Sequence, residues 1–303
     1  MNTDSKNEAD DQFAIVQALL SPSLEMRGLI PAHYGTRKTD RSMLESRREI
    51  DLVLELMEWT DRVVVANGAA SALPDEVTPV ESPGADLIIE EALADDERPL
   101  YIAFFGPLTD MASALLIDPS IRDRNVVVVW IGGGRWPTGG NECNLSNDIH
   151  SANVVMRSRV QVWMIPTPVF WQTSVGYAEL LERVYPVGEL GKYLVEQLVD
   201  WNARFVNAPI EYRALGDSPA VGVLLNPDCG RYTMHPAPEF ADDMTYVHTG
   251  AHRPIRVYET IDSRFILEDF FAKVTRFGRN RNAIPESLQR LADGREFPPS
   301  IKS

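Results

Sequence analysis

The chain has 303 residues, of which 44% are hydrophobic and 24% are charged, and this balance is typical of a globular protein. Lys and Arg number 29 against 44 Asp and Glu, so the formal net charge of −15 argues against nucleic acid or an anionic membrane surface as a partner. No apolar run reaches the ~18 residues of a membrane-spanning helix. No signal peptide is recognisable, and the two cysteines make no disulfide framework. We therefore expect a cytoplasmic location.

Apolar blocks alternate with helical periodicity over residues 1–170. In chain order they predict a helix over 10–20, a strand over 26–33, a helix over 40–59, a strand over 62–66, a loop over 69–83, a helix over 85–94, a strand over 100–105, a helix over 109–116 and strands over 125–131 and 160–166. Continuous apolar runs are typical of strands buried on both faces. The alternation predicts an α/β fold with an open, mainly parallel, doubly wound sheet flanked by helices.

The last third of the chain is less regular. It predicts helices over 177–207, an irregular Pro-rich stretch over 208–250, a strand over 253–258 and a helix over 265–277. We expect one domain over residues 1–280 and a polar peripheral tail over 281–303.

Acidic residues are concentrated at the start of the chain. Asp4, Glu8, Asp10 and Asp11 lie within eight residues, directly before the first predicted helix. Carboxylates offer hard oxygen ligands, which suit calcium or magnesium rather than zinc. The alternative is a solvated charge run in which Asp10 caps the helix. The pattern alone leaves both open.

Two further segments carry polar side chains after predicted strands. Residues 106–110 read Gly-Pro-Leu-Thr-Asp, a turn from a strand into a helix, and residues 140–144 read Gly-Asn-Glu-Cys-Asn. Carboxylate and amide groups such as those of Glu142 and Asn144 can bind vicinal hydroxyls. A glycine run over 132–134 lacks the complete dinucleotide-binding pattern.

The run over residues 3–14 resembles the opening signature of the inosine-uridine-preferring nucleoside hydrolases, and the segments over 106–110, 140–144 and 213–220 resemble later motifs of that family. In that family an aspartate cluster binds one calcium ion and supplies the general base that activates a water. The resemblance covers most of the chain. It implies a nucleoside hydrolase-like fold and calcium-dependent hydrolysis of the N-glycosidic bond of ribonucleosides, small molecules that yield base and ribose. It also suggests a homodimer or a homotetramer.

The resemblance assigns roles residue by residue. It implies that Asp4 is the general base and that Asp10, Glu142 and Asn144 bind the sugar hydroxyls. The calcium ligands that it implies are Asp4, Asp11, Asp217 and the main-chain carbonyl of Phe105. His33, at the carboxyl end of its predicted strand, is a candidate for sugar or leaving-group contacts, and a purely structural role is its alternative.

The chain departs from the family pattern at several positions: Asn2 for Asp, Thr36 for Asn, Asp110 for Asn, Cys143 for Phe and Gly216 for a His implicated in protonating the departing base. The family's first strand is expected to be absent. These departures keep a second hypothesis open, a calcium-stabilised nucleoside-binding homologue with impaired catalysis. A third is a haloacid-dehalogenase-like magnesium phosphatase, in which Asn2 would replace the nucleophilic Asp.

Overall fold

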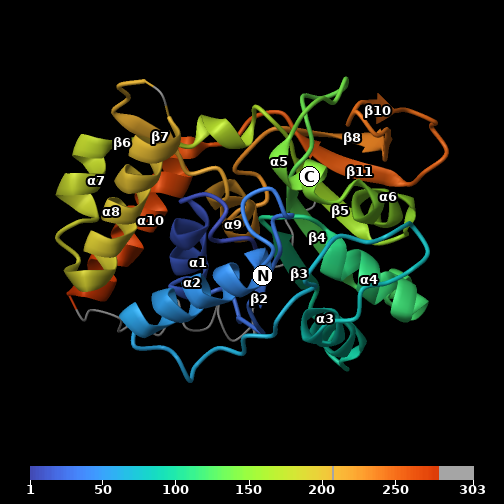
Figure 1. Cartoon of the computed structure of the whole chain (residues 1–303), viewed down its shortest axis with the longest axis horizontal. Coiled ribbons are helices and arrows are strands. Elements are labelled where there is room, and N and C mark those ends of the chain that lie inside the picture. The colour runs from blue at the N-terminus through green and yellow to red at the C-terminus, as the bar shows by residue number, and fades with distance from the viewer. Residues whose placement is uncertain (207, 280–303) are drawn as a thin grey trace, which may run out of the picture.

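A seven-stranded sheet crosses the centre of the structure, a computed structural model that describes residues 1–206 and 208–279 (Figure 1). The strand order is β2-β1-β3-β4-β5-β11-β8. Neighbouring strands run parallel except at the edge pair β11 and β8. In this order the strands span Ile30–Pro31, Asn2–Thr3, Leu100–Phe104, Val126–Ile131, Gln161–Ile165, Pro254–Tyr258 and Tyr232–Pro236. The predicted α/β fold with a mainly parallel sheet is therefore confirmed.

Helices cover both faces of this sheet. One face carries α3, α4 and α6, at the right of Figure 1, and the other carries α1, α9 and α10, with α2, α7 and α8 packed outside them. These helices are α1 (Asp11–Leu19), α2 (Ser42–Leu56), α3 (Pro83–Leu93), α4 (Thr109–Ile117), α6 (Ile149–Arg157), α7 (Tyr177–Arg183), α8 (Gly188–Phe205), α9 (Ser218–Leu225) and α10 (Ser263–Gly278).

Short elements complete the described chain. They are the helix α5 (Cys143–Asn147), the 3-10 turns η1 (Pro119–Asp123) and η2 (Phe170–Gln172), and the antiparallel pairs β6 (Ser174–Gly176) with β7 (Tyr212–Ala214) and β9 (Glu239–Phe240) with β10 (Tyr246–Val247).

Strand β4 explains why the central sheet is buried on both faces. All six of its residues are buried, and successive side chains point to opposite faces. Val128 and Trp130 pack among α3, α4 and α6, whereas Val129 and Ile131 pack against α1 and α9. The continuous apolar run therefore supplies two hydrophobic layers at once.

The expectation that the first strand is absent is wrong. Asn2 and Thr3 form β1, which pairs with β2 on one side and with β3 on the other. Two residues carry too little periodicity to be recognised as a strand. Asp4 consequently follows an internal strand of the sheet, next to the edge strand β2.

Two other predicted segments differ from the structure. The predicted strand over 62–66 makes only an isolated bridge, between Val65 and Leu29, because it lies beyond the sheet edge, where Val64 is 58% exposed. The stretch over 208–250, predicted irregular, contains α9 and β8. Helix α9 was not predicted because it contains Pro219, and proline usually indicates a break in a helix. Proline is, however, tolerated in the first turn, which is where Pro219 lies.

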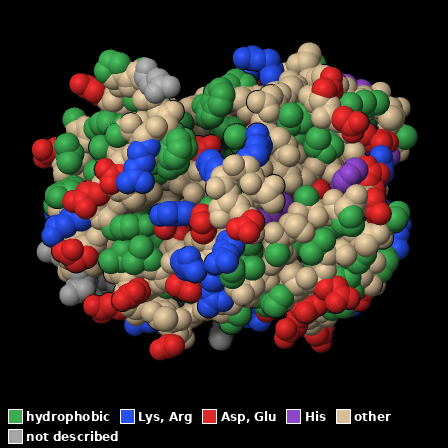
Figure 2. Space-filling view, in the orientation of Figure 1, with side chains coloured by type: hydrophobic (Ala, Val, Ile, Leu, Met, Phe, Trp, Pro, Cys, Tyr) green, Lys and Arg blue, Asp and Glu red, His purple; other side chains and the backbone are tan. Residues whose placement is uncertain are grey.

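The charged side chains on the surface reflect the excess of Asp and Glu over Lys and Arg in the sequence. Figure 2 shows acidic side chains spread over one face with Lys and Arg interspersed among them. Within residues 1–206 and 208–279, no helix is both long and apolar enough to cross a membrane. The predicted tail over 281–303 lies outside the described residues.

Candidate active site

Three neighbouring parallel strands place site residues at their carboxyl ends. β1 ends directly before Asp4, β3 ends directly before Phe105, and β4 leads into the glycine run and then to α5. The three strands are adjacent in the order β1-β3-β4, so their ends meet at one edge of the sheet. This edge is where ligands bind in open α/β sheets.

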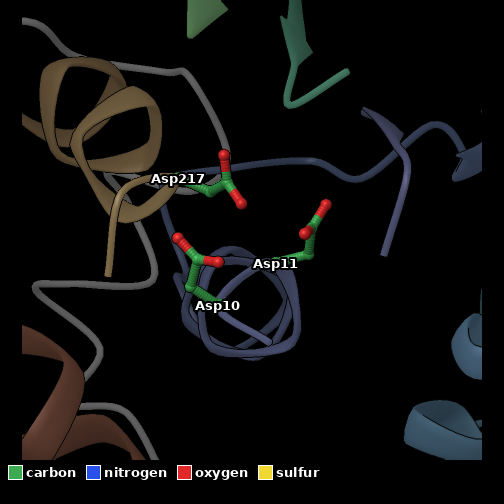
Figure 3. A group of neighbouring side chains, drawn as sticks. All are labelled: Asp10, Asp11 and Asp217. Carbon is green, nitrogen blue, oxygen red and sulfur yellow. The ribbon is translucent and has the colours of Figure 1, made fainter. Parts of the chain in front are cut away.

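Three aspartates gather beside this edge. Asp10, Asp11 and Asp217 each offer a carboxylate oxygen, and these oxygens all lie within 4.8 Å of one another. Figure 3 shows the three carboxylates turned towards a shared space, two from the start of α1 and one from the segment entering α9. All three residues are buried, with exposed fractions of 7%, 2% and 6%. The packing of α1 against α9 therefore joins acids that are far apart in the sequence.

Local hydrogen bonds fix the orientation of two of these carboxylates. Thr3 Oγ1 donates to Asp11 Oδ1 at 2.5 Å, and the backbone N–H of Gly216 donates to Asp10 Oδ2 at 2.7 Å. The first bond ties the cluster to β1, and the second ties it to the approach to α9. Both carboxylates are thus held by the scaffold before any ligand arrives.

Asp4 lies next to the cluster of three but is not part of it. It is 2% exposed, and Asn7 Nδ2 donates to its Oδ2 at 3.0 Å. Gly106, which follows β3, packs so closely that a Cβ there would lie 3.1 Å from the Asp4 Cβ. A side chain at position 106 would therefore crowd Asp4.

Burial of so many acids in one place disfavours their charged forms. Burial, followed by the charge of Asp11, raises the pKa of Asp4 well above its usual range. Burial, followed by the charge of Asp10, raises the pKa of Asp11 to about 8. Burial and then Asp11 also raise the pKa of Asp217. A positive charge among these carboxylates would favour their ionised forms and would so offset the effects of burial and of the neighbouring negative charges.

Arg213 supplies part of that positive charge. Its guanidinium forms an ion pair with Glu8, lies 3.5 Å from Asp10 Oδ1, and stacks 4.3 Å from the ring centroid of Trp201. Because the arginine forms an ion pair with only one of the three clustered aspartates, Asp10, the charge of Asp11 still acts on Asp217 and raises its pKa.

Glu142 uses its carboxylate to begin α5. Its Oε2 accepts hydrogen bonds from the N–H groups of Gly133 at 2.8 Å and Leu145 at 2.9 Å, and its Oε1 accepts one from Asn144 N at 2.9 Å. This arrangement is an N-cap that also holds the glycine run after β4. Oε1 retains acceptor capacity for a hydroxyl, whereas the two hydrogen bonds to Oε2 take both of its lone pairs.

Asn144 links two strand ends. Its Nδ2 donates to the Phe105 carbonyl at 3.0 Å and to the Ile131 carbonyl at 2.9 Å. Its amide oxygen accepts no hydrogen bond from the described part of the chain. The bond to Phe105 occupies one of two lone pairs on a carbonyl that was predicted as a calcium ligand. That role of Phe105 stays a prediction.

His33 is 1% exposed and both of its ring nitrogens have protein partners. Gly35 N donates to Nδ1 at 3.2 Å, and Nε2 lies 2.8 Å from Thr109 Oγ1, which itself donates to Asp148 Oδ2 at 2.6 Å. Nε2 is therefore the ring nitrogen that donates, and burial lowers the pKa of His33 to about 4. This geometry favours the structural alternative for His33, and its substrate role stays a prediction.

Gly216 leaves the position before Asp217 without a side chain. A Cβ at Gly216 would lie 3.2 Å from Cδ2 of Phe170 and 3.1 Å from Asp10 Oδ2. The aromatic ring thus occupies the space that a side chain at position 216 would enter.

Sequence reasoning did not identify Asn7 and Arg213 as members of this site. Asn7 contacts Asp4, and Arg213 contacts Asp10. Arg213 lies within a motif that the sequence analysis singled out, so its charge close to Asp217 was a usable signal. Asn7 gave none, because a polar residue within an acidic run is common on protein surfaces.

Solved structures and curated sequences resemble this chain over most of its length. A purine-preferring ribonucleoside hydrolase from Gardnerella vaginalis superposes with a TM-score of 0.76 and 21% identity, covering 92% of this chain and 98% of the other. A plant nucleoside hydrolase gives a TM-score of 0.73 and 19% identity, covering 90% and 97%. A pyrimidine-specific ribonucleoside hydrolase of Escherichia coli is 26% identical over 252 residues, covering 72% of this chain and 77% of that protein.

The sequence model of the inosine-uridine preferring nucleoside hydrolases matches residues 1–268. This match covers both β1, with the aspartates that follow it, and the segment that carries Asp217. The chain therefore belongs to the inosine-uridine preferring nucleoside hydrolase family, a family of enzymes that hydrolyse N-glycosidic bonds.

Proposed function

We propose that this chain hydrolyses the N-glycosidic bond of ribonucleosides, with calcium bound at the aspartate cluster. The observation that carries the proposal is the convergence of Asp10, Asp11 and Asp217, whose oxygens lie within 4.8 Å of one another directly beside Asp4. Burial of three carboxylates at one point, with a fourth beside them, is costly without a cation.

The donor set fits a hard divalent cation. Asp4, Asp11 and Asp217 offer carboxylate oxygens and Phe105 offers a carbonyl oxygen, which are the ligand types that calcium takes. Burial and the neighbouring carboxylates raise the pKa values of these three aspartates, and a bound cation would offset both effects. When bound, calcium would supply the charge that keeps these carboxylates ionised and would contact the ribose diol.

The chain's own residues would carry the proton and hold the sugar. Asp4 accepts the proton of the attacking water, whose oxygen bonds to C1′ while the bond from C1′ to the base nitrogen breaks. The electron pair of that bond leaves with the base. Asp10, Glu142 and Asn144 bind the sugar hydroxyls, and the surrounding carboxylates stabilise the positive charge that develops on the ribose ring.

The leaving group receives no proton from position 216, because Gly216 has no side chain and Phe170 fills the adjacent space. The enzyme would therefore depend on the leaving group's own ability to accept the electron pair. This feature separates the proposal from the pattern that the family resemblance implies.

Of the two alternatives, the phosphatase hypothesis is disfavoured, because the sequence model of the nucleoside hydrolases matches residues 1–268. The impaired nucleoside-binding homologue loses one argument, since β1 is present and holds Asp4 at a strand end. It remains the outcome to expect if calcium binds and no nucleoside is cleaved.

The test is release of ribose, measured as reducing sugar, from inosine, uridine, cytidine and adenosine, with calcium and then with a chelator. Asp4→Ala is compared with Asp228→Ala, a matched removal of an exposed aspartate. We expect calcium-dependent turnover in the wild type and in Asp228→Ala, and its loss in Asp4→Ala. Turnover that survives in Asp4→Ala, or is insensitive to chelator, contradicts the proposal.

Three further statements stay predictions. They are a single domain over residues 1–280, assembly into a homodimer or homotetramer, and a cytoplasmic location. The family match over residues 1–268 supports the first of them.

A further inference from the structure

Lys38, in the loop between β2 and α2, contacts the acidic opening segment. Its Nζ donates to the carbonyl oxygen of Asn7 at 2.6 Å and to the side-chain oxygen Oδ1 of Asn7 at 2.8 Å. Trp201 Nε1, from α8, donates to the same carbonyl at 3.3 Å. Three segments that are distant in the sequence therefore meet at Asn7.

Aromatic rings surround the ammonium group of Lys38. Its Nζ lies 5.9 Å from the ring centroid of Tyr34, 5.9 Å from that of Trp201 and 5.6 Å from that of Phe205. The faces of aromatic rings attract cations at such distances. Although the side chain is exposed as a whole, these contacts hold its charged end in place.

The hydrogen bond from Lys38 to Oδ1 decides which way the side-chain amide of Asn7 faces, whereas the bond to the backbone carbonyl holds the ammonium group beside it. An ammonium group can only donate, so the amide must present Oδ1 to it. The other end of the amide, Nδ2, is then turned to Asp4 and donates to its Oδ2 at 3.0 Å. With the amide reversed, Oδ1 would face a carboxylate and Nδ2 would face an ammonium group, and both contacts would be repulsive.

We propose that Lys38 is a positioning residue of the hydrolase, which acts on the general base through Asn7. The rings of Tyr34, Trp201 and Phe205 hold Lys38, Lys38 orients Asn7, and Asn7 fixes the Asp4 carboxylate by its Oδ2. The second oxygen, Oδ1, is then available to accept the proton of the attacking water. This inference rests on the role of Asp4 in the proposed function.

The experiment combines a double-mutant cycle with a conservative variant. Lys38→Met removes both donors and keeps the aliphatic stem, Lys38→Arg keeps donors, and Asn7→Ala removes the amide. Lys192→Met is the matched control, because Lys192 is a partly exposed lysine of α8 that pairs with Glu189 at 2.7 Å. For each variant kcat and KM are measured on the best nucleoside, and calcium affinity is measured by calorimetry without substrate.

We expect Lys38→Met to lower kcat by about tenfold or more, since small misplacements of a catalytic group can cost about 100-fold. KM should change less than kcat, Lys38→Arg should restore most of the rate, and Lys192→Met should match the wild type. In the Asn7→Ala background, Lys38→Met should add no further loss of kcat or of calcium affinity.

Two results overturn the inference: a Lys38→Met enzyme with the kcat and calcium affinity of Lys192→Met, or a loss that persists at full size in the Asn7→Ala background. Failure of the proposed function has a different signature. If the wild type cleaves no nucleoside while the calcium affinities still show the non-additive pattern, hydrolysis is refuted and the orientation of Asp4 by Lys38 is upheld. If the wild type neither binds calcium nor cleaves a nucleoside, both are refuted.

Discussion

Asn2 Nδ2 donates a hydrogen bond to Asp110 Oδ2 at 2.8 Å, joining the first strand to the first turn of α4. The family pattern places Asp at the first of these positions and Asn at the second, so this chain has the carboxylate and the amide at exchanged positions, and here they form a pair. Ser82 Oγ and Ala69 N donate to the other oxygen of Asp110. Asp110 lies in the first turn of a helix, where acids are stabilised, and this position and its hydrogen bonds oppose the burial that raises its pKa.

The exchange predicts a specific pattern of stability. Asn2→Asp should lower the free energy of unfolding by about 3 kcal/mol or more, because it places two carboxylates against each other in a buried site. The double variant Asn2→Asp with Asp110→Asn should recover most of that loss. Urea unfolding of the two single variants and the double variant measures the coupling. Additive losses would show that the pair is not a unit.

The metal-free cluster predicts how stability depends on pH. Burial and Asp10 raise the pKa of Asp11 to about 8 in the folded protein, so the folded state binds more protons than the unfolded state from about pH 4 to about pH 8. The contribution is complete below about pH 4 and is lost as the pH rises through about 8. In chelator, we expect the melting temperature to fall across this window, and less steeply in Asp11→Asn.

Calcium should reverse this dependence, because ion binding requires the carboxylates in their ionised form. The same melting curves recorded with calcium provide the check. Stabilisation by calcium that disappears towards low pH is expected, whereas a calcium effect of equal size at pH 5 and pH 8 would place the ion elsewhere.

The lack of an acidic side chain at position 216 predicts that the rate of cleavage depends steeply on the leaving group of the substrate. Positioned acid catalysis contributes about 10²–10⁴-fold where it operates, and Gly216 offers no acid. We therefore expect p-nitrophenyl riboside, whose leaving group departs without a proton, to be cleaved at least about 100-fold faster than inosine or uridine. Equal kcat/KM values for the aryl riboside and a natural nucleoside would point to an acid elsewhere in the site.

Gly216→His tests the same feature from the protein side. A side chain at position 216 would meet Phe170 and Asp10, so the substitution should lower activity towards every substrate instead of supplying the missing acid. The paired variant Gly216→His with Phe170→Ala opens the space. Rates with inosine and with the aryl riboside, measured for both variants, separate a steric effect from gain of an acid.

Local sequence patterns predicted the parts of this protein that depend on local structure. The apolar runs over 100–105 and 125–131 became β3 and β4, and motif resemblance selected Asp11 and Asp217. The approach of Asp10 to Gly216, 206 positions apart, follows from helix packing, which no local periodicity encodes. The two residues of β1 were missed because their partners, not their own pattern, define them as a strand.

The supporting polar groups were missed for a related reason. Lys38 reads as an ordinary surface cation in the sequence, whereas Arg213 lies in the motif over 213–220 but its partner could not be predicted. Their contacts with Asn7 and with Asp10 exist only after α8 and β7 have packed beside the opening segment. Tertiary contacts of this kind are set by the whole fold.

His33 gives the remaining prediction, because its two possible roles lead to opposite kinetic results. The ring links Gly35 to Thr109, and Thr109 passes a hydrogen bond to Asp148, so His33→Ala would leave buried polar groups without partners. Such losses cost about 1–3 kcal/mol each. We expect a lower free energy of unfolding in urea and little change in KM once the folded fraction is taken into account. A KM raised tenfold or more at unchanged stability would instead establish His33 as a substrate ligand.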